Sequence, residues 1–537
     1  MAISSTSSLN CLVGVARSRS KVILWRTSGW STMRNVGKAC DEDIPEASAD
    51  LVRLHGRTAT AFRSLGRDLL RWYWRASPEV AASDSVASDS VASDWAAQSP
   101  RAFVAYLEVR RARVAAGEPV ASLDDLLAVA ERFVDDSAAR GQRASFFGTE
   151  GRLVQSPRFA RRLLGEQPVW NPQAWTAHRQ AHRSLREQCR RARAKGVVIQ
   201  EVDPRHVTAG ATGEAVQQLV TRWRATRSMS PMGFLVQIDF TTQSAARRVF
   251  LAQQNGQLVG LLAMAPVPAR AGWLLEHLLR DPDAPNGTAD LLVDHAMLQL
   301  AADGVTWASL GLAPLHGPVD GWLQRVRHWS RPLFNFEGLA AFKRKLRPDR
   351  WEPIYLAWPR EGSGWRALLD GLRAFAGGSL LRFALRTIFR GPTPLLRALC
   401  WLLVPWTLVL AAAPTAAWFP HTAVHAAWVL FDVLLVVALW TLLRRQAFAP
   451  RTTVARRHTA RLALLLATCV SLDALLTAWQ AWAFNMPRVH TVVDVVIVWL
   501  ACLGPLVAAP VLWGAARRLR VLARPRPQLD WPSSLTT

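Results

Sequence analysis

Residues 273–312, WLLEHLLRDPDAPNGTADLLVDHAMLQLAADGVTWASLGL, hold the pattern from which the fold of this chain can be inferred. The apolar run at 274–279 has the length of a buried strand. The next segment, DPDAPNG at 281–287, holds two prolines and an Asn-Gly pair, so the chain must turn there. Thr288 is the expected N-cap of a helix that ends at Gly304, and Val305–Leu310 is expected as the next strand.

The loop in this pattern leads directly into the start of a helix. Such a loop presents unpaired backbone N–H groups and the positive end of the helix dipole. One interpretation is therefore a phosphate or carboxylate site at Asn286, Gly287 and Thr288, to which Arg280 adds a bidentate contact. The other is an ordinary turn between a strand and a capped helix, and both interpretations remain open.

Three separate segments carry a resemblance to a known family: LLRDPDAPNGTADLL at 278–292, LGLAPL at 310–315 and FNFEGLAAFKRKLRPDRWEPIYLAWP at 334–359. Together they resemble the synthase domain of the phosphatidylglycerol lysyltransferase (aminoacyl-phosphatidylglycerol synthase) family. The resemblance implies an α/β (α+β) fold of two tandem acetyltransferase-like (GNAT) domains. It also implies transfer of an aminoacyl group from aminoacyl-tRNA to the head-group hydroxyl of phosphatidylglycerol or a related lipid, and hence resistance to cationic antimicrobial peptides.

Changes in composition along the chain predict its organisation. A repeat, ASDSVASDSVASD at 82–94, is expected as a surface-loop insertion, and Phe234–Asp239 as a strand. The expected parts are a disordered segment at 1–48, a degenerate first GNAT-like domain at 49–165, a catalytic second GNAT-like domain at 166–360, a basic linker on the membrane surface at 361–395, four transmembrane helices at 396–513, and a basic cytoplasmic tail at 514–537.

Charge and cysteine content restrict the partners. Lys and Arg outnumber Asp and Glu by 25, which suits nucleic acid or an anionic bilayer without distinguishing them. The six cysteines are scattered and form no CxxC pair, so neither a disulfide framework nor a zinc site is expected. We expect no metal and no cofactor, with aminoacyl-tRNA as the donor substrate that the resemblance implies.

Four apolar stretches, at about 396–419, 423–443, 460–484 and 490–513, are long enough to span a bilayer. Arginines crowd the connection between the second and third stretches and follow the fourth, whereas the third connection holds only Arg488. By the positive-inside rule, the N-terminal domains and the C-terminus are expected on the cytoplasmic side of a bacterial inner membrane. Asp432, Asp473 and Asp494 are either functional intramembrane acids or partners in interhelical hydrogen bonds.

Ester exchange requires a proton acceptor for the attacking hydroxyl, donors for the oxyanion, and cations for phosphate groups. Asp290 and Asp294 lie four residues apart near the helix start and can share a face. Asp290 matches the family pattern, and Lys343 and Lys345 match family lysines. The predicted catalytic residues are Asp290, Arg280 and Lys343, and Asn286, Gly287, Thr288, Asp294 and Lys345 are predicted to bind substrate. A dipole-complementing Asp290 and exposed lysines are the alternatives.

A basic helix is expected at 171–196, where Arg186 and Arg190 are predicted to contact a tRNA acceptor stem or anionic lipid. A solvated helix face is the alternative. The loop RDPDAPNGT has a single glycine, unlike the glycine-rich pyrophosphate loop of coenzyme A-dependent GNAT enzymes, which favours another donor. An acyl-thioester-dependent acyltransferase and a non-catalytic lipid- or RNA-binding module remain alternatives to the aminoacyltransferase.

Overall fold

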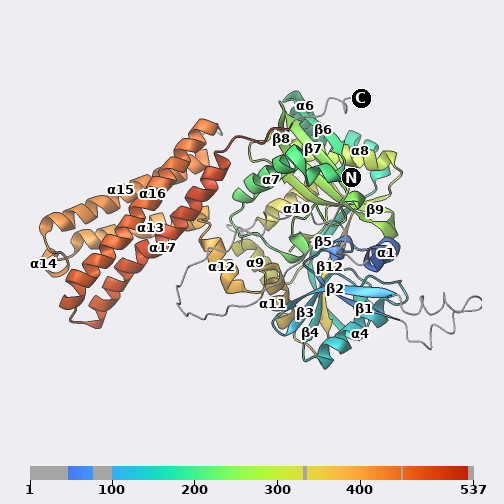
Figure 1. Ribbon diagram of the computed structural model, residues 1–537, viewed down its shortest axis with the longest axis horizontal. Coiled ribbons are helices and arrows are strands. Elements are labelled where there is room, and N and C mark those ends of the chain that lie inside the picture. The colour runs from blue at the N-terminus through green and yellow to red at the C-terminus, as the bar shows by residue number, and fades with distance from the viewer. Residues whose placement is uncertain (1–45, 76–99, 331–334, 449–451, 530–537) are drawn as a thin grey trace, which may run out of the picture. The chain divides into compact units, whose positions relative to one another are not determined.

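The computed structural model describes residues 46–75, 100–330, 335–448 and 452–529 (Figure 1). Almost all of the segment expected to be disordered, 1–48, lies outside the described residues, as does the repeat at 82–94. The described strands form one mixed sheet of twelve, in the order β1-β2-β3-β4-β12-β5-β10-β9-β8-β7-β6, with β11 paired to β5. In chain order the strands are β1 Leu70–Trp74, β2 Ala102–Val109, β3 Ala112–Ala116, β4 Arg143–Thr149, β5 Phe159–Trp170, β6 Val197–Val202, β7 Arg248–Gln254, β8 Gln257–Val267, β9 Gly272–Arg280, β10 Trp307–Ser309, β11 Ala313–Pro314 and β12 Arg350–Pro359.

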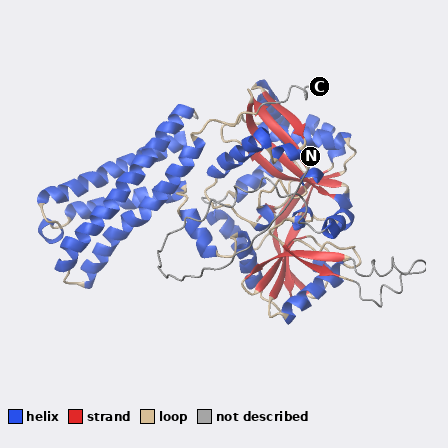
Figure 2. Cartoon of the chain, viewed as in Figure 1, coloured by secondary structure: helices blue, strands red, loops and turns tan. Residues whose placement is uncertain are grey.

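Helices flank this sheet (Figure 2). They are α1 Glu46–His55, α4 Leu126–Ala139, α5 Trp175–Ala181, α6 Arg183–Ala194, α7 Gly210–Ala225, α8 Thr288–Ala302, α9 Gly321–Ser330, α10 Phe336–Lys345, α11 Gly364–Phe375 and α12 Leu380–Ile388.

The sheet contains the same unit twice. β3 and β4 are parallel and joined through α4, and β9 and β10 are parallel and joined through α8, whereas the remaining paired strands are antiparallel. We call β1–β4 with β12 the first half, and β6–β10 the second half. β12 comes late in the chain but lies between β4 and β5, and the expected domain boundary at 165/166 lies inside β5. The two halves therefore share one continuous sheet.

Each half buries both faces of its strands, because alternate residues of a strand point to opposite faces. In β2, Phe103 and Ala105 contact the core under α11, whereas Val104 and Tyr106 pack under α4. The second half repeats this arrangement, with α8 and α6 packed on one face and α7 on the other. The parallel strands therefore have helices on both faces, as parallel sheets require.

Four described helices are long and apolar enough to cross a membrane: α13 Thr393–Ala412, α15 Thr422–Phe448, the run Thr453–Arg488 that begins with α16 Thr453–Gln480, and α17 Val492–Leu522. Their shared core includes Leu396, Leu439 and Leu466, while Leu408 and Leu475 stand largely exposed on the outside. An apolar outer surface of this kind suits lipid rather than water. The first span ends at Ala412, earlier than expected, because Pro414 follows and α14 Thr415–Trp418 is a separate turn.

Two other expectations need correction. Phe234–Asp239 is not a strand: Phe234 has a positive φ of 59°, and its buried ring packs on Phe147 and Phe375. The basic helix at 171–196 is broken at His182, whose backbone is extended, so α5 and α6 are separate.

The segment expected as a basic linker holds two helices, α11 and α12, because Gly377 and Gly378 both adopt positive φ between them. Its predicted position on the membrane surface stays a prediction.

Candidate active site

The candidate site lies at the carboxyl ends of the parallel strands β9 and β10, where α8 begins. Ligands of open sheets with helices on both faces bind in this kind of crevice. Gly287, not Thr288, is the N-cap of α8, and its φ is 93°. A Cβ at this position would collide with the backbone carbonyl of Gln188 on α6, so only glycine allows α8 to approach α6 this closely. Thr288 is the first helical residue, and its hydroxyl donates to the carbonyl of Pro285 at 2.8 Å.

Asp290 forms an ion pair with Lys345 across this crevice. The carboxylate Oδ1 lies 2.5 Å from the ammonium Nζ, which comes from the last residue of α10. Asp290 is 5% exposed, whereas the side chain of Lys345 is about one third exposed. The pair therefore joins a buried carboxylate to a cation that solvent can reach, and it brings two predicted site residues together.

Lys343 lies on the same helix but is buried. Its ammonium donates to the carbonyls of Leu310, Gly311 and Leu312, at 2.7–2.9 Å. These carbonyls belong to the segment that follows β10, so Lys343 ties α10 to the floor of the crevice. Burial lowers the pKa of Lys343 to about 7, which places its proton exchange near neutral pH.

Asp294 lies one turn further along α8 and is completely buried. It accepts from the indole Nε1 of Trp175 at 3.2 Å, and the guanidiniums of Arg193 and Arg179 approach it at 3.2 and 3.4 Å. These contacts fasten α8 to α5 and α6. The predicted substrate-binding role of Asp294 stays a prediction, and its described contacts are with the protein.

The loop before α8 is held by arginines that the sequence did not reveal. Arg222 of α7, 3% exposed, pairs with Asp281 at 2.6 Å and with Asp283 at 2.9 Å. Arg456 of α16 also pairs with Asp283, and Arg526 lies 3.8 Å from Asp281. The partners are 59 residues or more away in the chain, so no local pattern could indicate them.

The chain after α17 joins the same region. Pro527 accepts from the amide of Leu258 at 3.0 Å, and the amide of Leu529 donates to Gly256 at 2.8 Å. The side chain of Leu529 is buried in the core under α7. The last described residues therefore lie along the start of β8, beside the candidate loop.

The remaining predicted residues differ in their exposure and contacts. Arg280 is the half-buried last residue of β9, and Asn286 is exposed at the tip of the loop. Arg186 is exposed and donates to the carbonyls of Arg179 and Gln180, while the exposed Arg190 pairs with Glu187 at 2.9 Å. Within the described residues, no group of three or more His, Cys, Asp or Glu side chains gathers in a way that would hold a metal ion.

Comparison with known proteins identifies the family. Residues 86–358, slightly more than half of the chain, match the family model described as phosphatidylglycerol lysyltransferase, C-terminal. The phosphatidylglycerol lysyltransferase of Bacillus subtilis is 22% identical over 275 residues, which cover 49% of this chain and 31% of that protein. The bifunctional lysylphosphatidylglycerol biosynthesis protein LysX of Mycolicibacterium gilvum is 25% identical over 209 residues, or 36% of this chain and 18% of that protein. The matched part thus spans less than one third of these curated relatives.

Two solved structures share the fold. One is the C-terminal domain of a putative lysylphosphatidylglycerol synthetase from Agrobacterium fabrum, with a TM-score of 0.50 and 21% identity over 62% of this chain and 98% of that one. The other is L-PGS from Bacillus licheniformis, with a TM-score of 0.50 and 18% identity over 62% of this chain and 96% of that one. All three sequence segments that suggested the resemblance lie almost entirely within the matched residues. The chain therefore belongs to the phosphatidylglycerol lysyltransferase C-terminal family.

Proposed function

We propose that this protein is a membrane-anchored aminoacyltransferase, which moves an aminoacyl group from aminoacyl-tRNA to the head-group hydroxyl of phosphatidylglycerol or a related lipid. The observation that carries the proposal is the Asp290–Lys345 ion pair at the start of α8, inside the segment that matches the family. The family and the four apolar helices support a membrane lipid as the acceptor.

In the proposed reaction the lipid hydroxyl oxygen bonds to the acyl carbon, and the ester bond to the tRNA ribose oxygen breaks. The hydroxyl proton passes to the carboxylate of Asp290 and then to the departing ribose oxygen. The ammonium of Lys345, 2.5 Å from the carboxylate, orients Asp290 and stabilises the negative charge that develops on the acyl oxygen. Lys343 acts as a positioning residue, because its ammonium holds the backbone of 310–312 in place.

The donor is already activated as an ester, so the proposed transfer needs no cofactor. The tRNA itself requires a basic surface, since phosphate contacts dominate the affinity of nucleic-acid binding. Helix α6 supplies such a surface beside α8, with its arginines exposed, Arg186 and Arg190 among them. We assign these side chains to the acceptor end of the tRNA.

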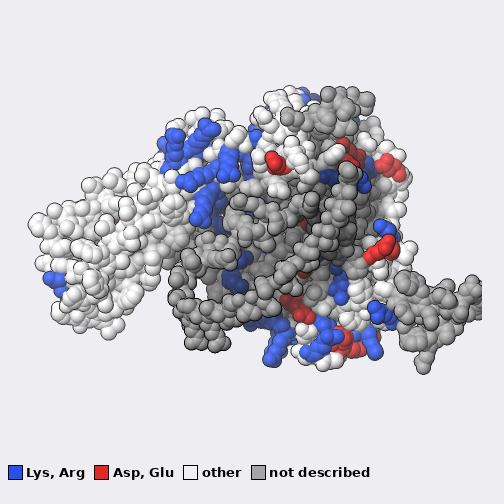
Figure 3. Space-filling model, in the orientation of Figure 1, with Lys and Arg blue, Asp and Glu red and all other residues white. Residues whose placement is uncertain are grey.

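We propose that the helices α13–α17 lie in a bacterial inner membrane with the sheet on the cytoplasmic side. On the face drawn in Figure 3, Lys and Arg gather at one end of the four-helix bundle, one small basic patch lies near the other end, and the surface between them shows no charged side chain. This distribution follows the positive-inside rule. In this proposed orientation the candidate site faces the compartment that contains tRNA. Transfer of an aminoacyl group with a free amine makes the membrane less anionic.

Lipid mass spectrometry tests the proposal. The chain is expressed in a bacterium that lacks aminoacylated lipids, and wild type is compared with Asp290→Asn, Lys345→Met and Arg280→Ala. We expect a phospholipid heavier by one aminoacyl residue in wild type, and a reduction of about 10²- to 10⁴-fold when the proton acceptor Asp290 is removed.

Asp303→Asn is the matched control, because it makes the same chemical change at the opposite end of α8, where Asp303 pairs with Arg248 near the surface. Its product level should equal that of wild type. If folded, membrane-inserted wild-type protein yields no new lipid, the proposal is wrong.

A further inference from the structure

The first half holds a second crevice, equivalent by topology to the candidate active site. It lies at the carboxyl ends of the parallel strands β3 and β4, beside the start of α4. A small cavity opens there, lined by His55, Arg57, Thr58, Ala61, Glu118–Ala121, Leu123, Leu126 and Arg152. The sequence predicted a degenerate domain here and assigned no chemistry to these residues.

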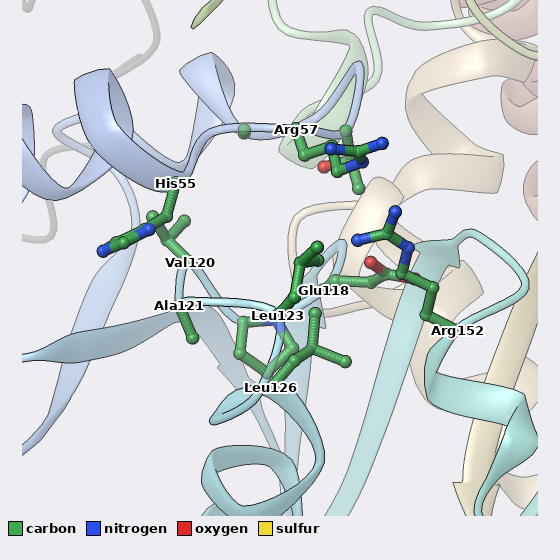
Figure 4. A pocket seen from close by; sticks show the side chains of 11 residues that line it. His55, Arg57, Glu118, Val120, Ala121, Leu123, Leu126 and Arg152 are labelled. Atoms are coloured by element: carbon green, nitrogen blue, oxygen red, sulfur yellow. The ribbon is translucent and has the colours of Figure 1, made fainter. Parts of the chain in front are cut away.

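Two arginines in this cavity have no partner of their own. Neither Arg57 nor Arg152 makes a hydrogen bond or ion pair with any described residue, and the Nε of Arg57 and an Nη of Arg152 are buried without an acceptor. Figure 4 shows both side chains converging with Glu118 on one space. A buried N–H group without an acceptor is costly, so such a group in a native structure calls for an explanation.

A neighbouring arginine differs from these two in having carboxylate partners, although its Nε is also buried without an acceptor. Arg270 pairs with Glu150 and, at 3.1 Å, with Glu352, while Gln167 bridges the same two carboxylates. These acids are therefore already engaged by Arg270. Among the residues that line the cavity, Glu118 is the acid beside Arg57 and Arg152, and Glu150 acts on both arginines from outside that lining.

Glu118 balances them poorly. It is 8% exposed and accepts from the amide of Glu150 at 2.8 Å. Burial, and next the carboxylate of Glu150, raise the pKa of Glu118 to about 7, so the side chain is partly neutral at physiological pH. The cavity thus carries an excess of positive charge with donors directed inward.

The size of the cavity limits what can enter. Its volume of about 20 Å³ holds one or two groups of the size of a water molecule. That excludes a nucleotide or a sugar ring, but it admits one or two oxygen atoms of a phosphoryl group. Arginine pairs are well suited to such a group, because the guanidinium fork matches phosphate oxygens.

We propose that Arg57 and Arg152 form a phosphate-binding site in the first half, separate from the Asp290 crevice. Free inorganic phosphate and the phosphate of a lipid head group present the same oxygens. The site depends on the geometry of the first half alone and does not rest on the proposed transferase activity.

Isothermal titration of the full chain in nanodiscs of a phosphate-free lipid, digalactosyldiacylglycerol, tests this proposal, with sulfate and inorganic phosphate as probes at constant ionic strength. We expect saturable binding of one anion per chain. Arg57→Gln and Arg152→Gln should each weaken binding at least tenfold, and the double variant should abolish it. Folding should persist, because neither substitution removes a described partner of another residue.

Two further variants sharpen the result. Arg132→Gln removes an exposed arginine from α4 of the same half and should leave binding unchanged. Glu118→Gln removes a negative charge that repels the anion, so it should tighten sulfate binding at pH 8. Absence of saturable binding in wild type, or equal binding in the Arg57/Arg152 double variant, would overturn the proposal.

The nanodisc composition distinguishes the two sources of phosphate. If a lipid head group is the natural occupant, adding phosphatidylglycerol to the discs should displace sulfate from wild type. If free phosphate is the occupant, sulfate should bind equally in both kinds of disc. Either outcome supports the site, and each names a different ligand.

Discussion

The two crevices at the ends of the parallel strand pairs have the same topology, but their charged side chains differ in whether they have partners within the protein. In the second half Asp281, Asp290, Asp294 and Lys343 each have protein partners at hydrogen-bond distance. In the first half Arg57 and Arg152 have none among the described residues. The second-half crevice is therefore held in place by contacts among its own side chains. The first-half crevice has arginines without partners, which suits the phosphate that we propose as its ligand.

The largest contrast should appear when one arginine is removed from each half. Arg222→Ala leaves Asp281 buried without its main cation, which should lower the free energy of unfolding by about 3–5 kcal/mol. Arg57→Gln should leave stability unchanged, because no described side chain depends on it. Urea denaturation in detergent, followed by tryptophan fluorescence, measures both. Equal losses from the two variants would remove the distinction between the halves.

The two crevices should also respond to pH in separate windows. The folded-state pKa of Lys343, about 7, lies below its ordinary 10.5, so the folded protein binds fewer protons between these values and stability should rise with pH there. The folded-state pKa of Glu118, about 7, lies above its ordinary 4.5, so stability should fall as pH rises from 4.5 to 7. The total change in the free energy of unfolding should be about 5 kcal/mol across the Lys343 window and about 3 kcal/mol across the Glu118 window.

Lys343→Met and Glu118→Gln separate these two contributions. The first variant should flatten only the alkaline slope of the unfolding free energy, and the second only the acid slope. If the double variant shows the same pH dependence of the unfolding free energy as wild type, other groups cause that dependence.

A smaller contrast is expected at two glycines with similar φ angles. Alanine at Gly287 or Gly117 meets the same backbone penalty, since φ is 93° and 91°. At Gly287 the new Cβ collides with the backbone of Gln188, which cannot move without shifting α6, whereas at Gly117 it meets the side-chain hydroxyl of Thr60. Gly287→Ala should therefore cost about 1–3 kcal/mol more, in thermal unfolding, than Gly117→Ala. Equal losses of stability in the two variants would mean that α6 shifts easily to make room for the new Cβ at residue 287.

The smallest effects should come from exposed arginines. Arg186→Ala and Arg190→Ala on α6 should not change stability, because both side chains are largely in solvent. If α6 contacts tRNA, each should weaken binding a few-fold and reduce the salt dependence of the affinity by about one counterion. Arg132→Ala on α4 provides the first-half comparison and should leave both quantities unchanged. Filter binding at several salt concentrations distinguishes these outcomes.

Local patterns predicted the second half well. The turn chemistry of DPDAPNG placed the ends of β9 and α8 to within a residue or so, because prolines and glycines restrict the backbone directly. The one-residue error at the N-cap arose because Gly287 is required by the approach of Gln188, a contact that Thr288 does not reveal. The apolar runs likewise predicted helices long enough to span a membrane.

Long-range contacts were beyond such patterns. The Asp290–Lys345 pair joins residues 55 apart, and the segment match suggested both residues without showing that they meet. The sequence could not predict that Arg222 pairs with Asp281, because an arginine on an amphipathic helix is expected to face solvent. Phe234 was mistaken for a strand residue because its ring is held by packing on Phe147, a long-range contact, and not by strand pairing.

The position of β12 has a consequence for biosynthesis. Because this strand lies between β4 and β5, the first half stays incomplete until residue 359 has left the ribosome, although most of its strands are made two hundred residues earlier. Strand pairing over such a separation is slow, and unpaired edges invite aggregation. The first apolar helix begins at Thr393, only a short segment later. Completion of the sheet and delivery to the membrane therefore fall close together in time. A chaperone that covers the open edge between β4 and β5 would act before β12 is synthesised.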